Sequence, residues 1–208
     1  MLGIACFACY AVQIYTKSQS QTLIFLFNPW HVITLAWGIV LTSEYSNFSQ
    51  IMFLYAVSNI WGPYIGIVFA ENDELSLAIE IYSYWIQHII VAIIAPFTCI
   101  LWGRYAHNDY LKPHIIICGF QFFTLYMRLF LTPLSAYTFA NLNHTLWGID
   151  NDPFRAYFKL GKYYYFWSEF YLWFGSWLWT TITLGVSNLI RPSIFKENFA
   201  LVEKEKTD

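Results

Sequence analysis

The sequence predicts an all-α fold, a polytopic membrane bundle of about six helices. Its 208 residues are 58% hydrophobic and only 12% charged, whereas a soluble domain carries about 25% charged residues. The apolar residues gather in long runs separated by short polar segments. A soluble fold of this length has too little interior to hide so much apolar surface. We therefore place the chain among the integral, multi-pass membrane proteins.

The predicted spans follow from the lengths of the apolar runs, because a spanning helix needs roughly 20 such residues. The runs that reach this length are residues 22–42, 49–70, 77–102, 113–140 and 164–190. The first run, residues 1–15, covers roughly 22 Å of helix, so we interpret it as the lower part of a helix whose beginning is missing. Residues 1–195 then form one transmembrane domain, and residues 196–208 form a polar tail.

The loops between the runs predict the orientation. Lysines and arginines favour a cytoplasmic C-terminus, because basic residues concentrate on that side of a membrane. Glycosylation sequons begin at Asn47 and Asn143. The runs 49–70, 77–102 and 113–140 separate them, so the two sequons face opposite sides and at most one is used. We predict that Asn143 is the lumenal one.

Several predicted spans contain a proline, namely Pro29, Pro63, Pro96 and Pro133. Each proline removes a helix hydrogen bond, which a bundle tolerates where neighbouring groups bond the freed backbone. Pro29 directly precedes Trp30 and His31. We therefore expect a kink that opens the helix beside this histidine.

Two histidines lie near the middle of apolar runs, His31 in 22–42 and His88 in 77–102. An ionisable group at the membrane midplane is costly and marks a functional site by default. We expect both imidazoles to be neutral and to meet inside the bundle. Arg128, near the centre of the run 113–140, should keep its charge.

The segment around His88 carries a polar ladder. Glu80, Tyr84 and His88 are spaced four residues apart, so they share one face of a helix. One interpretation is ordinary interhelical hydrogen bonding, worth about 0.6 kcal/mol per bond in membrane bundles. The other is a proton-transfer base, His88, with an orienting chain behind it.

Thr34 is the hydroxyl nearest to His31 in the sequence, and a hydroxyl paired with a histidine is a common nucleophile. The alternative is that Thr34 bonds its own helix backbone.

No nucleic-acid partner is expected at a net charge of −2. We predict no cofactor and no metal, because the cysteines lie within apolar runs and the loop histidine and aspartates lack metal-site spacing.

Three short motifs resemble the transmembrane protein 164 family, which is related to membrane lipid hydrolases of the androgen-induced gene 1 type. Asn28-Pro-Trp-His-Val is similar to the family's Asn-Pro-Cys-His-Val. Residues 79–88, which end in Ile-Gln-His88, resemble its Glu-Ile-Tyr-Tyr-Ile-Gln-His stretch. Asn141-Leu-Asn followed by Asp152-Pro-Phe resembles its Asn-Leu-Asn and Asp-Pro-Phe loop. The likeness covers residues 27 to about 158.

This resemblance implies a multi-spanning protein that transfers acyl chains between phospholipids. The family's proposed nucleophile is the motif cysteine, at the position that Trp30 occupies here, and its partner histidine corresponds to His88. Tryptophan cannot act as a nucleophile. The expected roles are then a base for His88, an orienting group or second base for His31, and a nucleophile from Thr34 or water. Lipid contacts are expected from Trp30, Tyr84, Arg128 and Glu80.

Three functions remain open at the level of sequence. The first is an acyltransferase-like protein whose partners are a phospholipid or other acyl lipid and the bilayer, in an endomembrane such as the endoplasmic reticulum or Golgi. The second is a catalytically inactive lipid-binding protein, favoured by Trp30. The third is a proton-coupled transporter, which is expected to show discontinuous helices and inverted repeats.

Overall fold

The computed structural model describes residues 1–70, 75, 77–101, 105, 112–144, 146, 159 and 163–194, and every element within them is helical. The all-α prediction is therefore confirmed for this part of the chain. The first half contains α1 (Leu2–Gln19), the 3₁₀-helix η1 (Leu23–Phe27), α2 (Pro29–Thr42), α3 (Asn47–Ser58) and α4 (Trp61–Val68). The second half contains α5 (Ala78–Ile89), η2 (Ile90–Ile94), α6 (Ala95–Leu101), α7 (Pro113–Leu125), η4 (Tyr126–Leu131), α8 (Thr132–Thr138), η5 (Leu142–His144) and α10 (Tyr164–Ile194).

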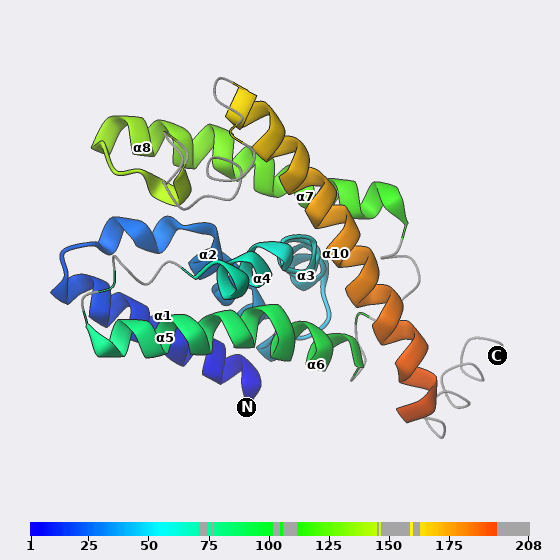
Figure 1. The fold of residues 1–208 in the computed structure, drawn as a ribbon. Helices are drawn as coiled ribbons and strands as arrows, with labels where there is room; N and C mark the ends of the chain where they lie inside the picture. Colours follow the sequence, from blue (N-terminus) through cyan, green and yellow to red (C-terminus); the bar gives the residue numbers. More distant parts are fainter. Residues whose placement is uncertain are drawn as a thin grey trace.

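The helices pack around a central pair, α3 and α4 (Figure 1). The continuous rod of α5, η2 and α6 runs along one side with α1 beside it, and the rod of α7, η4 and α8 runs along the other. The long α10 crosses the bundle and packs against α6, α7, α3 and α4. The candidate site lies between α2, α4 and α5.

Three helical stretches are long and apolar enough to cross a membrane: Asn47–Val68, Ala78–Leu101 and Pro113–Thr138. They match the predicted runs 49–70, 77–102 and 113–140 to within two residues at every end that is described. The predicted boundary between domain and tail at residue 195 lies outside the described residues.

The predicted span 22–42 is not one helix. Residues 23–27 form a 3₁₀ turn, and α2 begins at Pro29 and has 14 residues, so it covers only about 21 Å. Pro29 occupies the first helical position, where its missing N–H costs nothing. The expected kink beside His31 is therefore wrong. His31 lies in the first turn of α2 rather than near the middle of a helix.

The prolines at positions 96 and 133 are accommodated inside continuous rods. Each follows a π-helical stretch by two residues, η2 before Pro96 and η4 before Pro133. Ala95 and Thr132 donate their backbone N–H groups to carbonyls five residues back. This wider turn is a common way for a helix to absorb a local irregularity.

The span that contains Pro63 is broken into α3 and α4, and side chains bond backbone carbonyls near the end of α3. Asn59 Nδ2 donates to the Tyr55 carbonyl at 2.6 Å. Two hydroxyls of α10 reach across the bundle: Thr180 donates to the Val57 carbonyl at 3.0 Å, and Ser176 donates to the Ser58 carbonyl. The break is thus closed by polar groups, as a helix interruption in lipid requires.

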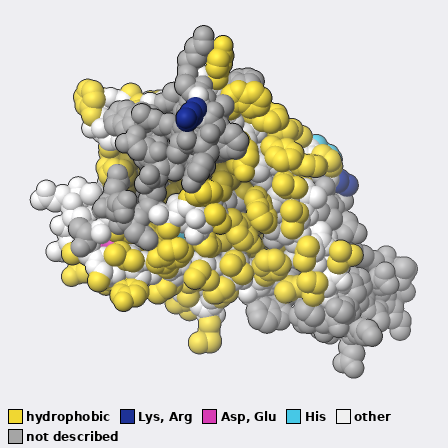
Figure 2. All heavy atoms as spheres, viewed as in Figure 1, with side chains coloured by type: hydrophobic (Ala, Val, Ile, Leu, Met, Phe, Trp, Pro, Cys, Tyr) yellow, Lys and Arg dark blue, Asp and Glu magenta, His cyan; other side chains and the backbone are white. Residues whose placement is uncertain are grey.

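The burial pattern of α10 is reversed from that of a helix in a soluble protein. The buried side chains include hydroxyls spaced three or four residues apart, and the exposed ones are large and apolar. The buried hydroxyl residues are Ser176, Thr180, Thr183 and Ser187. Among the described residues on the face seen in Figure 2, hydrophobic side chains likewise predominate. This pattern fits a surround of lipid rather than water.

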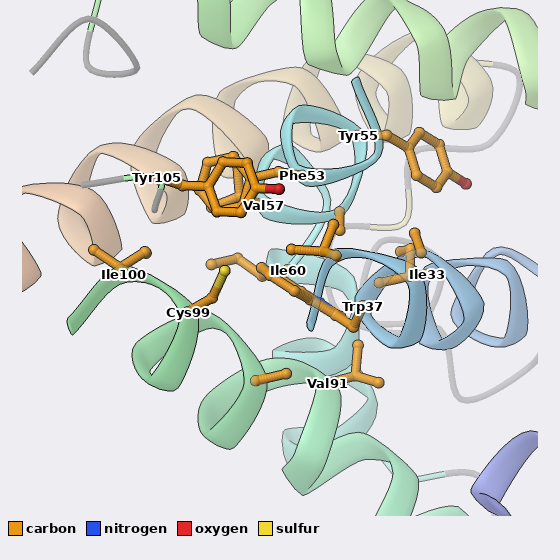
Figure 3. Packing of buried hydrophobic residues seen from close by; sticks show 14 of the residues in the cluster. Ile33, Trp37, Phe53, Tyr55, Val57, Ile60, Val91, Cys99, Ile100 and Tyr105 are labelled. Carbon is orange, nitrogen blue, oxygen red and sulfur yellow. The ribbon is translucent and has the colours of Figure 1, made fainter. Parts of the chain in front are cut away.

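The apolar core lies where α2, α3 and the α5–α6 rod meet (Figure 3). Trp37 of α2 is fully buried and contacts Phe53 of α3 edge-on, with ring centroids 6.0 Å apart. Phe53 in turn stacks on Tyr105 at 4.4 Å. This core fixes α2 against the rod that carries His88.

Candidate functional site

The buried face of α5 is polar. The inward side chains lie at positions i, i+3, i+7 and i+8, which is one face of an α-helix; they are Glu80, Ser83, Gln87 and His88. The outward side chains are mostly apolar and include Ile79, Tyr82, Ile86 and Ile89. The predicted polar ladder therefore faces the protein interior, with the half-buried Tyr84 at its edge.

Gln87 joins α5 to the beginning of α2. Its side-chain nitrogen lies 2.6 Å from Thr34 Oγ1 and 3.1 Å from His31 Nδ1. The backbone carbonyl of Trp30 is 3.5 Å from the same nitrogen. Gln87 is only 2% exposed, so these groups are its available partners. The Gln87 amide thus contacts a backbone carbonyl, an imidazole and a hydroxyl in the first turns of α2.

Thr34 uses its hydroxyl proton within its own helix. Its Oγ1 donates to the Trp30 carbonyl at 2.7 Å. This is the backbone-bonded arrangement that is usual for threonine in a membrane helix. The hydroxyl also accepts from Gln87. Neither imidazole is bonded to Thr34, so the geometry gives it no adjacent base.

His88 is held on the other side of α5, against α4. Its Nδ1 lies 2.8 Å from the Tyr84 carbonyl, and its ring is 3.9 Å from the Tyr84 ring, centroid to centroid. The Tyr84 hydroxyl donates to the Gly66 carbonyl of α4 at 2.6 Å. A Cβ on Gly66 would lie 2.7 Å from His88 Cδ2 and Nε2. Only glycine leaves room for the imidazole here.

Trp30 packs on the same face of α4, one turn away. A Cβ built on Gly62 would come within 2.1 Å of the Trp30 ring, so the indole lies directly on the glycine. Gly62 and Gly66 are four residues apart, about 6 Å along the helix. Residues 30 and 88, far apart in the sequence, therefore converge on neighbouring turns of one helix.

The two histidines belong to one cluster, but their rings face different helices. His31 is hydrogen-bonded to Gln87 of α5, whereas His88, the next residue of α5, packs on Gly66 of α4. Among the described residues, no hydrogen bond joins one ring to the other. We expected the two imidazoles to meet directly. Instead, His31 bonds Gln87, the residue next to His88 in α5.

Glu80 acts at the beginning of α5. Its carboxylate accepts from the Leu77 backbone N–H at 3.3 Å and from the Ser20 hydroxyl at 3.4 Å. A glutamate at this position caps a helix and interacts favourably with its dipole. Glu80 lies eight residues before His88, about 12 Å along the axis, so its described bonds are structural rather than part of the cluster.

Arg128 was expected to bind lipid near the histidines, but it is not part of the buried cluster. It lies on η4 with an exposed side chain, while His31 and His88 are both buried. The cluster's hydrogen bonds come from α2, α4 and α5. The position of Arg128 in the sequence predicts where it lies along its helix. It does not predict whether the side chain faces the interior or the surface.

Sequence reasoning missed three residues of the site: Gln87, Gly62 and Gly66. The signal for Gln87 was its place on the Glu80 face, since Glu80 and Gln87 are seven residues apart. The signal for the glycines was their spacing of four, a small-residue pattern typical of close helix contact in membranes. The described residues contain no group of three or more metal-ligating side chains.

Comparison with protein-family models and with solved structures gave no match to this chain.

Proposed function

We propose that this chain is a membrane-embedded protein that handles phospholipid acyl chains, related to the transmembrane protein 164 family that it resembles. One observation carries the proposal. The positions that the resemblance pairs as nucleophile and base, Trp30 and His88, lie on neighbouring turns of one face of α4, against Gly62 and Gly66. Positions that lie 58 residues apart have no local reason to converge in this way.

The proposed chemistry uses His88 as the general base. Its Nε2 takes the proton of an attacking hydroxyl, from water or from an acceptor lipid. The hydroxyl oxygen then bonds to the carbonyl carbon of an acyl ester, the bond from that carbon to the donor-lipid oxygen breaks, and the proton passes to the leaving oxygen. Thr34 is a poorer nucleophile, because its proton is bonded to the Trp30 carbonyl.

The replacement His88→Ala tests this proposal. Purified protein in phospholipid vesicles is assayed for acyl exchange between labelled phospholipids. We expect a loss of at least about 100-fold, the usual contribution of a general base. His114→Ala, at an exposed histidine of α7, is the matched control and should keep the activity. Undiminished exchange by His88→Ala would rule out His88 as the base.

A second candidate is a lipid-binding protein without catalysis. The indole of Trp30 fills the space over Gly62, where the resembled family has a cysteine. Trp30→Cys tests this candidate by the appearance of a thioester-linked acyl label. Trp85→Cys, on the neighbouring α5, is the control. A label on the first variant only would favour a retired acyl-transfer site, and a label on neither would count against the resemblance.

A proton-coupled transporter is less well supported. The break between α3 and α4 is the kind of discontinuity that such proteins use to expose backbone carbonyls to an ion. Here the carbonyls of Tyr55, Val57 and Ser58 accept hydrogen bonds from side chains. Each of these carbonyls thus has a hydrogen-bond partner within the protein, as a purely structural break in a membrane helix requires.

For the membrane arrangement, we propose that all six apolar runs lie in the bilayer. The reversed burial pattern of α10, with its hydroxyls inside and aromatic rings outside, supports this for the last run. By resemblance we assign the protein to an endomembrane such as the endoplasmic reticulum or Golgi. Microscopy of the tagged full chain against markers of both organelles tests this assignment.

A further inference from the structure

Each of the two buried histidines makes a hydrogen bond through Nδ1, but the partner of His88 is an acceptor and that of His31 is a donor. His88 Nδ1 lies 2.8 Å from the Tyr84 carbonyl oxygen. A carbonyl can only accept a hydrogen bond, so Nδ1 must carry the proton. A neutral imidazole has one N–H. The Nε2 of His88, beside Gly66, therefore presents a lone pair.

His31 has the opposite arrangement. Its Nδ1 lies 3.1 Å from the side-chain nitrogen of Gln87. The orientation of this amide follows from Thr34. The Thr34 proton is donated to the Trp30 carbonyl at 2.7 Å, so Thr34 Oγ1 can only accept at 2.6 Å from Gln87. Gln87 must therefore present its NH₂ group. His31 Nδ1 accepts from it, and the proton of His31 lies on Nε2.

Both Nε2 atoms keep a place for another partner. Within the described part of the chain, the hydrogen bonds of the two imidazoles are made by Nδ1. Each Nε2 therefore keeps its hydrogen-bonding capacity for a ligand, although His31 and His88 are only 7% and 3% exposed.

We propose that Gln87 is a positioning residue that holds His31 in the Nε2–H tautomer, opposite to His88. The cluster then offers one neutral donor and one neutral acceptor. This pair suits an uncharged ester and a hydroxyl: His31 donates to the ester carbonyl oxygen, where negative charge develops, and His88 accepts the hydroxyl proton. This inference rests on the proposed function and gives His31 the role of stabilising the developing oxyanion.

The tautomers can be measured without any substitution. Full-length protein with ¹³C- and ¹⁵N-labelled histidine in lipid nanodiscs is examined by NMR near pH 7, where the ring carbon and nitrogen shifts distinguish Nδ1–H, Nε2–H and charged rings. Single histidine replacements assign the signals. We expect Nε2–H for His31 and Nδ1–H for His88. The same tautomer in both rings, or a charged ring in either, would overturn the inference.

The replacement Gln87→Glu tests the role of the amide. A carboxylate accepts but cannot donate, so His31 should shift to the Nδ1–H or the charged form. Acyl exchange should fall at least about tenfold. Gln121→Glu, at an exposed glutamine of α7, should change neither. An unchanged His31 signal in Gln87→Glu would refute the positioning role. The NMR result stands whether or not the protein exchanges acyl chains, so failure of the proposed function is seen separately.

Discussion

At the scale of single residues, the site depends on the missing side chain of Gly66 as much as on the side chains that line it. Gly66 has no Cβ, and this allows the His88 ring to lie against the α4 backbone. The ring is fixed from behind by its bond to the Tyr84 carbonyl and by its contact with the Tyr84 ring. It therefore has little freedom to move away from an added methyl group.

We predict that Gly66→Ala lowers the free energy of unfolding. The new Cβ would lie 2.7 Å from two atoms of the His88 ring, and such overpacking costs about 1–3 kcal/mol. This exceeds the gain of up to about 1 kcal/mol in helix propensity. Denaturant titration in detergent measures the change. Gly185→Ala, with no atom within 4 Å of the new methyl, should be neutral or stabilising. Equal stability of the two variants would contradict the close packing at Gly66.

At the scale of elements, the interrupted helix α3–α4 is joined to α10 by hydroxyls. Thr180 and Ser176 bond the carbonyls of Val57 and Ser58 that the break leaves without helical partners. The end of α3 is thus supported by another helix more than 100 residues later in the sequence. The bond made by Thr180 holds α10 in register with the end of α3, which leads into the site-bearing α4.

We predict that Thr180→Val destabilises the protein by about 0.6–1.7 kcal/mol, the range of interhelical hydrogen bonds in membranes. The change preserves the shape of the side chain and removes the donor to Val57. The neighbouring Thr181→Val is the matched control, because Thr181 Oγ1 has no hydrogen-bond partner among the described residues; it should be neutral or stabilising. Unfolding titrations that rank the two variants in the reverse order would refute the role of the hydroxyl.

At the scale of the whole molecule, the arrangement is set by which surfaces face lipid. The three stretches that can cross a membrane, Asn47–Val68, Ala78–Leu101 and Pro113–Thr138, all lie between the two sequon asparagines. Three crossings in this interval would put Asn47 and Asn143 on opposite sides of the bilayer. This relation holds whatever the number of further spans outside that interval.

We predict that expression in cells with a glycosylating secretory pathway adds a glycan at one sequon only, and that Asn143 is the site. Removal of the mobility shift by glycosidase and by Asn143→Gln, but not by Asn47→Gln, would bear this out. A glycan on Asn47 alone would invert the orientation. Glycans on both asparagines would exclude three crossings between them.

The sequence by itself determined the all-helical class, the limits of three apolar spans and the polar ladder of α5, because these depend on local composition and on the 3.6-residue helical period. The resemblance to the transmembrane protein 164 family led us to predict a pairing of residues 30 and 88. The tertiary structure decided that α2 begins at Pro29, that Arg128 points outward, and that Gln87, Gly62 and Gly66 complete the site. These features depend on which helices meet and how each is rotated about its axis, and that is set by packing and hydrogen bonds between segments distant in the chain.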